Sequence, residues 1–364
     1  MTPLEGILLE RTRAGPITFA AFMAAALYDD AHGYYRGGAR TGWDGHFVTS
    51  PELDPAFGSL WARLLEEVWR ACGAPERFDV VEIGPGEGSF AAGILEGAAP
   101  AFARALRLVL VEASEEGRSR QRRALGAGAP VSWVSSLDAV ARVACGCVLG
   151  NEVLDNQPVH VLRRGPRGVE ELWVAHADGR LEARWGALSD PGLGPSARSA
   201  PPDVRVEVSP AAARLVRAAA GAVARGAVAF VDYGAERAEL RARDGTLAAY
   251  GPEGVDDDVL ARPGARDITA HVDWTLVREQ LEGAGLRTAG PVPQRRLLER
   301  LGLVDLDAEL RRAHSDALAR GDGTAAVRAL SRRGGLAALT DPAGLGALGT
   351  VFGFAGIAPP PSLP

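Results

Sequence analysis

The 364-residue chain contains no lysine, so the 40 residues counted as lysine plus arginine are all arginines. The absence of lysine excludes Schiff-base chemistry, a lysine general base and the phosphate-binding P-loop, because each depends on that side chain. The 46 Asp and Glu residues outnumber the arginines and give a formal charge of -6. An acidic chain lacks the basic face that a phosphate backbone requires, so we expect no nucleic-acid partner.

Cysteine and long apolar runs are also scarce. The three cysteines, Cys72, Cys145 and Cys147, form no even-numbered disulfide framework, which is typical of a reducing compartment. Their spacing is not that of a metal site, so we expect no bound metal. No run of about 18 uncharged apolar residues is present that could span a membrane, and the acidic residues near the start are unlike a targeting leader. We therefore expect a cytoplasmic protein with no membrane partner.

The residues that are present predict an α/β protein. The chain is 47% apolar and 24% charged, which is a globular composition. Short apolar runs that end in glycine or a polar residue alternate with helical stretches, and this pattern predicts a mostly parallel sheet with helices on both faces. The runs that carry the prediction are 78–84, 107–113, 131–134, 145–152 and 227–234.

Further elements are expected around this sheet. Residues 159–164 and 169–176 alternate in polarity and predict a hairpin added to the sheet, and residues 349–357 predict another strand. Residues 31–58 and the acidic segment 235–268 are expected to be loops. Helices are expected at 17–30, with Thr18 as the N-cap, and at 56–72, 270–286 and 293–320.

A glycine-rich turn follows the first run of the sheet. Gly84, Gly86 and Gly88 come directly after the apolar residues VVEI. Glycines let the backbone turn tightly and approach a ligand closely, and the next helix offers free N–H groups. The spacing is GxGxG rather than the GxGxxG of dinucleotide sites, which favours S-adenosylmethionine over NAD. The alternative is a tight strand-to-helix turn without a ligand.

Two further positions fit a nucleoside. Glu112 ends the second run, where a carboxylate can accept hydrogen bonds from both ribose hydroxyls; the alternative is a solvated surface glutamate. Ser136 and Leu137 follow the third run, where an adenine is usually held, although an ordinary helix cap explains this segment equally well.

The fourth run is followed by a polar group that includes Asn151, Glu152 and Asp155. In open α/β sheets, ligands bind at the carboxyl ends of the strands. Packing does not explain several polar residues at that place, so we interpret them as part of a site. The alternative is a solvated loop with a helix cap from Asp155.

Taken together, these motifs resemble one family. The chain is similar to the MidA-type class I S-adenosylmethionine-dependent methyltransferases, relatives of the mitochondrial complex I assembly-factor protein arginine methyltransferase. The stretches that carry the resemblance run in family order through nearly the whole chain; they include ITFAAFMAAALYDDAHGYY, GHFVTSPELDPAFG, VVEIGPGEGSF, LVLVEASEEGRSRQ, GNEVLDNQPV and DITAHVDW.

The resemblance implies a class I methyltransferase fold, which is Rossmann-like, with an N-terminal helical cap and family-specific insertions. The implied segments are 1–76, with the cap and a cofactor-closing loop, 77–290, with the cofactor domain, and 291–364, with the last helices and strand. The cofactor is S-adenosyl-L-methionine, with S-adenosyl-L-homocysteine as product. The resemblance places it on these residues: Glu82, Gly84, Pro85, Gly86, Gly88, Glu112, Ser136, Leu137 and Asn151, with Phe47, Thr49 and Ser50 closing over it.

The implied chemistry is methyl transfer to a protein arginine. Carboxylates can hold a guanidinium by paired hydrogen bonds, and Glu152 and Asp155 are the best candidates. A second polar group is His271 with Asp273, in which the histidine can act as a general base or can be an ordinary structural histidine bonded to Asp273. Tyr34 and Tyr35 are candidates to line the acceptor pocket, although lone aromatics are usually packing residues.

Other functions stay open at this point. The family motif NExxD corresponds to residues 151–155 here. The residues around its aspartate, LDNQPV, depart from the usual family pattern and border the presumed acceptor pocket. A small-molecule methyltransferase is therefore the main alternative, beside a non-catalytic assembly protein and an NAD-dependent oxidoreductase. We expect a protein or small-molecule acceptor, and either a monomer or a homodimer.

Overall fold

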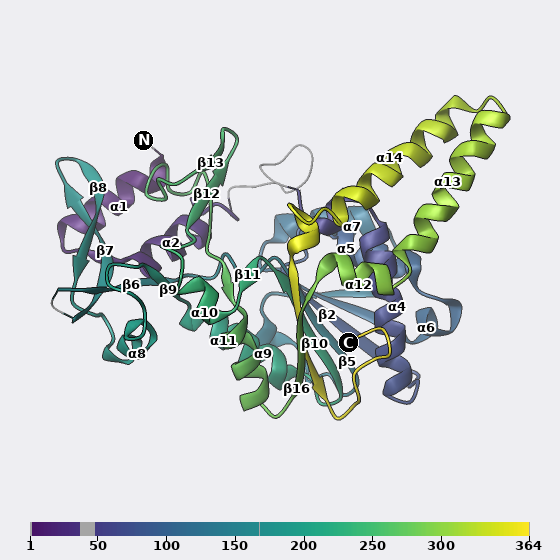
Figure 1. Ribbon diagram of the computed structural model, residues 1–364, viewed down its shortest axis with the longest axis horizontal. Helices are drawn as coiled ribbons and strands as arrows, with labels where there is room; N and C mark the ends of the chain where they lie inside the picture. Colours follow the sequence, from purple (N-terminus) through teal and green to yellow (C-terminus); the bar gives the residue numbers. More distant parts are fainter. Residues whose placement is uncertain (1, 37–47, 167, 364) are drawn as a thin grey trace. The chain divides into compact units, whose positions relative to one another are not determined.

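The protein is described here from a computed structural model that covers residues 2–36, 48–166 and 168–363 (Figure 1). It divides into two compact units, each made of segments that are distant in sequence. The first unit comprises Met1–Phe47, Val153–Val216 and Gly234–Val277, and the second comprises Val48–Glu152, Arg217–Tyr233 and Arg278–Pro364. The three consecutive segments expected from the sequence follow chain order, and these units cut across them.

The second unit is built on a seven-stranded sheet with the order β16-β17-β10-β5-β2-β3-β4. All neighbouring strands from β10 to β4 are parallel, whereas β17 runs antiparallel to both β10 and β16. The mostly parallel sheet of a class I methyltransferase fold is thereby confirmed. The strands are β2 (Phe78–Ile83), β3 (Leu106–Val111), β4 (Val131–Val134), β5 (Gly146–Asn151), β10 (Gly226–Asp232), β16 (Arg287–Pro293) and β17 (Gly349–Ala355).

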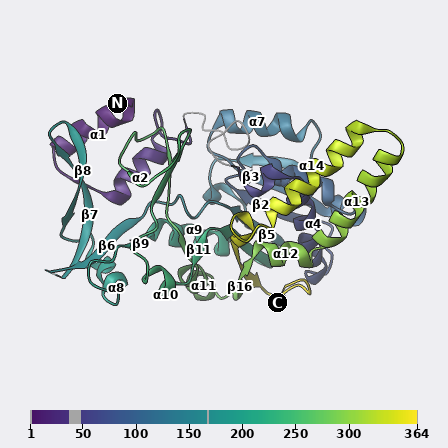
Figure 2. The same ribbon diagram turned by 45° about the horizontal axis from the view of Figure 1, so that its top comes forward.

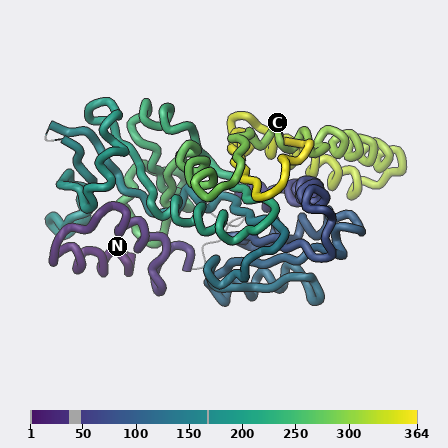
Figure 3. The backbone as a smooth tube through the Cα atoms, turned by 90° about the horizontal axis from the view of Figure 1, so that it is seen from below, coloured from purple at the N-terminus to yellow at the C-terminus, as the bar shows by residue number. Residues whose placement is uncertain are grey.

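Helices cover this sheet, and the last pair extends away from it as an antiparallel hairpin of α13 and α14 (Figures 1 and 2). The two coils of that hairpin run side by side in the backbone trace as well (Figure 3). The helices of the second unit are α3 (Ser50–Leu53), α4 (Ala56–Ala71), α5 (Ser89–Gly97), α6 (Pro100–Ala105), α7 (Glu115–Leu125), α12 (Gln294–Arg300), α13 (Leu303–Ala319) and α14 (Gly323–Leu339); α9 (Pro210–Ala222) and α11 (Trp274–Gly283) have residues in both units.

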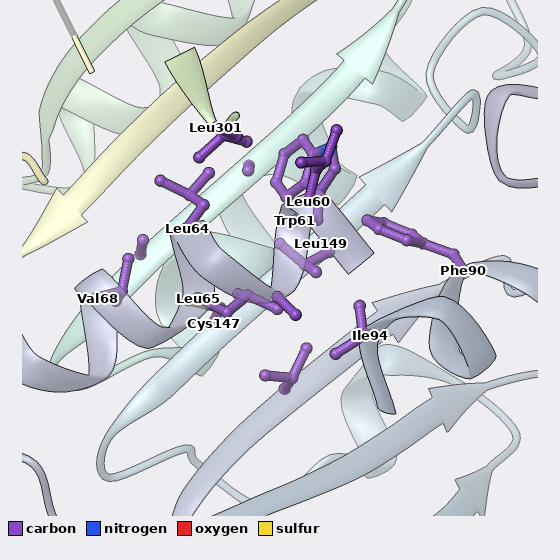
Figure 4. Packing of buried hydrophobic residues seen from close by; sticks show 14 of the residues in the cluster. Leu60, Trp61, Leu64, Leu65, Val68, Phe90, Ile94, Cys147, Leu149 and Leu301 are labelled. Atoms are coloured by element: carbon purple, nitrogen blue, oxygen red, sulfur yellow. The ribbon is translucent and has the colours of Figure 1, made fainter. Parts of the chain in front are cut away.

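The core of the second unit lies between α4 and the sheet. Leu60, Trp61 and Leu64 recur at the spacing of one helix face and are each at most 2% exposed. They pack toward Cys147 and Leu149 of β5, as the close view shows (Figure 4). On the central strands β2, β5, β10 and β17 nearly every side chain is buried, so this part of the sheet is covered on both faces, as the continuous apolar runs predicted.

The first unit contains a separate five-stranded antiparallel sheet, β1-β7-β6-β9, with β8 paired to β7. Its apolar core includes Leu8, Phe22, Val161 and Val174. The elements are α1 (Pro3–Arg13), α2 (Phe19–Tyr28) and α8 (Gly194–Ala197), with β1 (Ile17–Thr18), β6 (His160–Gly165), β7 (Gly168–Ala177), β8 (Arg180–Gly186) and β9 (Val206–Val208). Shorter strands complete it: β11 (Gly234–Ala235), β12 (Ala248–Gly251), β13 (Gly254–Asp256), β14 (Asp267–Thr269) and β15 (Val272–Asp273), beside the short helix α10 (Arg237–Leu240).

Several predictions about individual elements need correction. The hairpin β6-β7 belongs to the second sheet and not to the main one, because β9 and β1 supply its strand partners. The helix expected at 293–320 is two helices, since Gly302 has a φ of 98° and leaves the helical conformation. The segment 235–268 is not only loop but carries α10 and several short strands. Thr18 is the N-cap of α2, as predicted. Within the described residues, no helix has the length and hydropathy of a membrane span.

Candidate functional site

The candidate cofactor site lies at the carboxyl ends of β2, β3 and β5 in the second unit. The chain leaves β2 toward β3 and β4 on one side, and later returns on the other side of β2 through β5 and β10. Strand β2 is thus the point at which the strand order reverses, which is where open α/β sheets bind ligands. The predicted positions Glu82, Glu112 and Asn151 all lie at or just past the ends of these strands.

The glycine loop joins β2 to α5. Gly84, Gly86 and Gly88 have φ values of 64°, 52° and 88°, which side-chain-bearing residues rarely adopt. Gly88 is also the N-cap of α5, and its N–H donates to the carbonyl of Pro85 at 2.7 Å. The three glycines therefore suit the backbone path of this turn, and the first N–H groups of α5 have no partner within the helix itself.

Two buried acceptor atoms lie on neighbouring strands at this edge. Glu82 is 3% exposed and its Oε2 has no hydrogen-bond partner among the described residues. The Oδ1 atom of Asn151 also has none, while its Nδ2 donates to Oε1 of Glu152 at 2.9 Å. Burial raises the pKa of Glu82 to about 8. A site with unsatisfied buried acceptors is suited to a ligand that brings donors or a positive charge.

The Glu112 carboxylate is held from two directions. Its Oε1 accepts from the backbone N–H of Ser114 at 2.7 Å, and its Oε2 accepts from Nε2 of Gln121 at 3.2 Å. Sequence reasoning did not single out Gln121, because a buried glutamine within the strongly polar helix α7 leaves no periodic signal. A carboxylate has about four acceptor sites, so two remain for a ligand.

The other predicted cofactor residues differ in burial and in their hydrogen bonds. Ser136 is exposed and is the N-cap of a short 3-10 helix that begins at Leu137, but its side chain makes no capping hydrogen bond. Thr49 donates to Glu52 at 2.9 Å in a capping box at the start of α3. Ser50 is fully buried and donates to Gln294. Phe47 lies outside the described residues.

Glu152 directly follows β5 and has an unusual backbone conformation. Its φ is 51°, in the left-handed region that a glutamate adopts only at an energetic cost. Its N–H donates to the carbonyl of Val231 at 2.8 Å, and its Oε1 accepts from Asn151. The backbone and the carboxylate are therefore both fixed by neighbours in the second unit.

The predicted substrate residues belong to a hydrogen-bonded group in the first unit. Tyr35 donates to both carboxylate oxygens of Asp267 at 3.0 Å and accepts from Asn156, which itself accepts from Tyr28 at 2.8 Å. Burial and the Asp267 carboxylate raise the pKa of Tyr35, so the hydroxyl stays a donor. The ring of Tyr34 is buried and meets that of Tyr35 edge-on.

Asp155 also belongs to the first unit. Burial raises its pKa to about 7, which is near the value that suits proton exchange at neutral pH. Its backbone carbonyl accepts from the N–H of Ala270, so the segment after β5 is tied to the segment that carries His271.

His271 and Asp273 do not form the pair that their spacing suggested. The Asp273 carboxylate accepts from Arg237 at 2.7 Å and from the N–H of Leu276 at 2.9 Å, which caps α11. Nδ1 of His271 is buried without a partner in the part of the chain that the structure describes. Burial, with Arg243 nearby, lowers the pKa of His271, so its ring is neutral at pH 7 and able to accept a proton.

The predicted residues therefore divide between the two units. The glycine loop, Glu82, Glu112, Asn151 and Glu152 share the second unit, whereas Asp155, His271 and the two tyrosines belong to the first. No group of three or more His, Cys, Asp or Glu side chains suited to a metal ion occurs among the described residues.

Comparisons with known proteins agree on one family. A family model described as S-adenosyl-L-methionine-dependent methyltransferase matches residues 60–292. The chain is 30% identical to the Mus musculus mitochondrial protein arginine methyltransferase NDUFAF7, over 83% of this chain and 75% of that protein. It is 29% identical to the Drosophila melanogaster homolog of NDUFAF7, over 98% of this chain and 85% of that protein.

A solved structure agrees with these sequence matches. A Burkholderia thailandensis protein bound to S-adenosyl-homocysteine superposes with a TM-score of 0.86. It is 31% identical to this chain, and the match covers 98% of this chain and 92% of the other.

The relatives also correct the expected location. The sequence analysis expected a cytoplasmic protein, whereas the mouse, human and fly relatives are mitochondrial by name. The cytoplasmic prediction is therefore wrong, because few cysteines and short apolar runs do not distinguish one reducing compartment from another.

Proposed function

The chain belongs to this family of S-adenosyl-L-methionine-dependent methyltransferases, and from that premise we propose that it methylates a guanidinium nitrogen of a protein arginine. The names of the mouse and fly relatives support this class of acceptor. In the structure, the observation that carries the proposal is the Glu152 carboxylate, which is fixed at the end of β5 in the same unit as the glycine loop.

The residues of the second unit fit the cofactor. The unsatisfied acceptors Glu82 Oε2 and Asn151 Oδ1 suit an ammonium group such as that of the methionine part, and Glu112 suits a ribose. The glycine loop lets the backbone come close to the ligand without a side chain between them. When bound, S-adenosyl-L-methionine supplies a methyl group attached to a sulfonium.

Glu152 has two tasks in this proposal. Its carboxylate holds the cationic guanidinium by charge-assisted hydrogen bonds and so orients one nitrogen toward the methyl carbon. As that nitrogen forms its bond to the methyl carbon, the carbon–sulfur bond breaks and its electron pair stays on sulfur. The nitrogen then loses a proton, for which Glu152 is the proposed base.

The test is the substitution Glu152→Gln, which keeps the shape and one acceptor but removes the charge and the base. We expect methyl transfer to fall by roughly 10² to 10⁴, the usual contribution of one acid–base group. Binding of S-adenosyl-homocysteine should stay near the native value. The measurement is single-turnover transfer of a labelled methyl group to protein, with methylarginine identified after hydrolysis.

The acceptor is tested in the same assay by offering protein and small metabolites from one lysate as separate fractions. Label on arginine of the protein fraction supports the proposal. Label only on metabolites contradicts the arginine assignment and indicates a small-molecule methyltransferase. A native turnover rate in the Glu152→Gln variant contradicts the role given to Glu152.

A further inference from the structure

One face of helix α7 contacts the carboxylate of Glu112, which is proposed to bind the cofactor ribose. Gly117 and Gln121 are four residues apart in α7, so they lie on the same face of that helix. Both are buried, although the helix as a whole is strongly polar. Buried positions in such a helix call for an explanation from the groups that they contact.

Both the oxygen and the nitrogen of the Gln121 side-chain amide make hydrogen bonds, and the donor-only indole of Trp133 determines which way the amide is turned. The indole N–H of Trp133 can only donate, and it bonds Oε1 of Gln121 at 2.9 Å. Nε2 must then point the other way, where it donates to the carbonyl of Gly86 at 2.8 Å and to Glu112 Oε2 at 3.2 Å. One amide thereby connects the glycine loop to the Glu112 carboxylate.

Gly117 leaves the space that this carboxylate fills. A methyl group on Gly117 would lie 2.8 Å from Cδ and 2.9 Å from Oε2 of Glu112. Alanine is the better helix former, so helix propensity does not explain a glycine at this position. The close approach of the Glu112 side chain explains why a glycine stands here.

We infer that Gly117 and Gln121 are positioning residues that set the Glu112 carboxylate for the two neighbouring hydroxyls of the cofactor ribose. The inference rests on the proposed role of Glu112 and deepens it. The Ser114 N–H and Gln121 each take one carboxylate oxygen, which leaves each oxygen one further acceptor site for one hydroxyl.

The first test is Gly117→Ala, which places a methyl group where the Glu112 carboxylate lies. The added methyl group displaces the Glu112 carboxylate, so the Kd for S-adenosyl-homocysteine should rise about ten-fold, the effect of one charge-assisted hydrogen bond lost or misplaced. The melting temperature should change little, because the helix propensity that alanine adds opposes the loss of the hydrogen bonds that hold the displaced carboxylate. Gly334→Ala in α14 is the matched control, since nothing lies within 4 Å of a methyl group there.

A double-mutant cycle with Glu112→Ala tells positioning from a general structural effect. Glu112→Ala alone should raise the Kd by roughly ten- to a hundred-fold. Adding Gly117→Ala should then change nothing more, because the group that the methyl displaces is gone. Gln121→Glu keeps the acceptor for Trp133 but loses both donated bonds, and it should weaken binding at least as much as Gly117→Ala.

The outcomes of these tests distinguish the positioning role of Gly117 and Gln121 from the ribose role proposed for Glu112. An unchanged Kd in Glu112→Ala overturns the ribose role of Glu112, and with it the inference. If Glu112→Ala binds S-adenosyl-homocysteine more weakly but Gly117→Ala keeps the native Kd, the positioning role of Gly117 is overturned and the ribose role of Glu112 stands. The inference is also overturned if Gly117→Ala raises the Kd by the same factor in the native background and in the Glu112→Ala background. Gly117 would then act independently of that carboxylate.

Discussion

If the ammonium group of the cofactor binds beside Glu82, as proposed, we expect binding to release a proton from that buried carboxyl. Glu82 is 3% exposed, and burial raises its pKa to about 8. In the cofactor-free protein at pH 7, roughly nine in ten molecules should therefore carry the proton on Glu82. Its Oε2 has no partner among the described residues, so no hydrogen bond within them compensates a negative charge on that atom.

A bound ammonium group reverses this balance. A positive charge within a few ångströms favours the ionised carboxyl and lowers its pKa. If the pKa of Glu82 falls by two units or more, binding of S-adenosyl-homocysteine at pH 7 should release about 0.8 to 0.9 proton per site. At pH 5 the release depends on how far the pKa falls, and at pH 9 it should nearly disappear because the carboxyl is already ionised.

Titration calorimetry measures the release directly. The observed enthalpy is compared at pH 7 in phosphate and in Tris, whose ionisation enthalpies differ, and the slope gives the number of protons. The Glu82→Gln variant should bind more weakly and release none, whereas Glu112→Ala should keep the release because Glu82 is intact. An enthalpy that is the same in both buffers would refute the pairing of Glu82 with the ammonium group.

Three further predictions concern the same strand end and loop. Because the folded-state pKa of Glu82 lies above its ordinary value of 4.5, the native fold should lose stability as the pH rises from about 4.5 to 8, by at most about 5 kcal/mol; thermal melting of Glu82→Gln should lack this loss. Gly86→Leu should abolish binding of S-adenosyl-homocysteine, since a side chain would fill the close approach at a φ of 52°. Calorimetry of the native protein with NAD should show no binding, and clear NAD binding would count against the GxGxG interpretation.

The parts of the fold that the sequence predicts are those with local signals. The run before Gly84 is continuous and apolar because β2 is buried on both faces, and the glycines mark a turn that other residues would strain. Thr18 likewise shows itself as a helix cap, since its hydroxyl needs only the N–H of Ala21. These features depend on neighbours within a few residues along the chain.

The features that the sequence did not predict depend on distant partners. The hairpin of β6 and β7 has the right alternation, but its sheet is decided by β9 and β1, which lie far from it in sequence. Gln121 becomes visible as part of the site only when Trp133 and Gly86 are known to surround it. In the same way, the sequence suggested a pair of His271 and Asp273, whereas in the structure the Asp273 carboxylate accepts a hydrogen bond from Arg237.

The backbone of Glu152 gives a reason to test this carboxylate before the others. A glutamate with a φ of 51° costs roughly 1 to 3 kcal/mol and persists only where its surroundings impose it. Here its N–H is bound by Val231 and its carboxylate by Asn151, both in the second unit. The chain passes into the first unit directly after Glu152, so the two carboxylates of the NExxD motif belong to different units. Of the two, Glu152 is the one that shares a unit with the glycine loop, which is why the substitution Glu152→Gln is the first test of the proposed role.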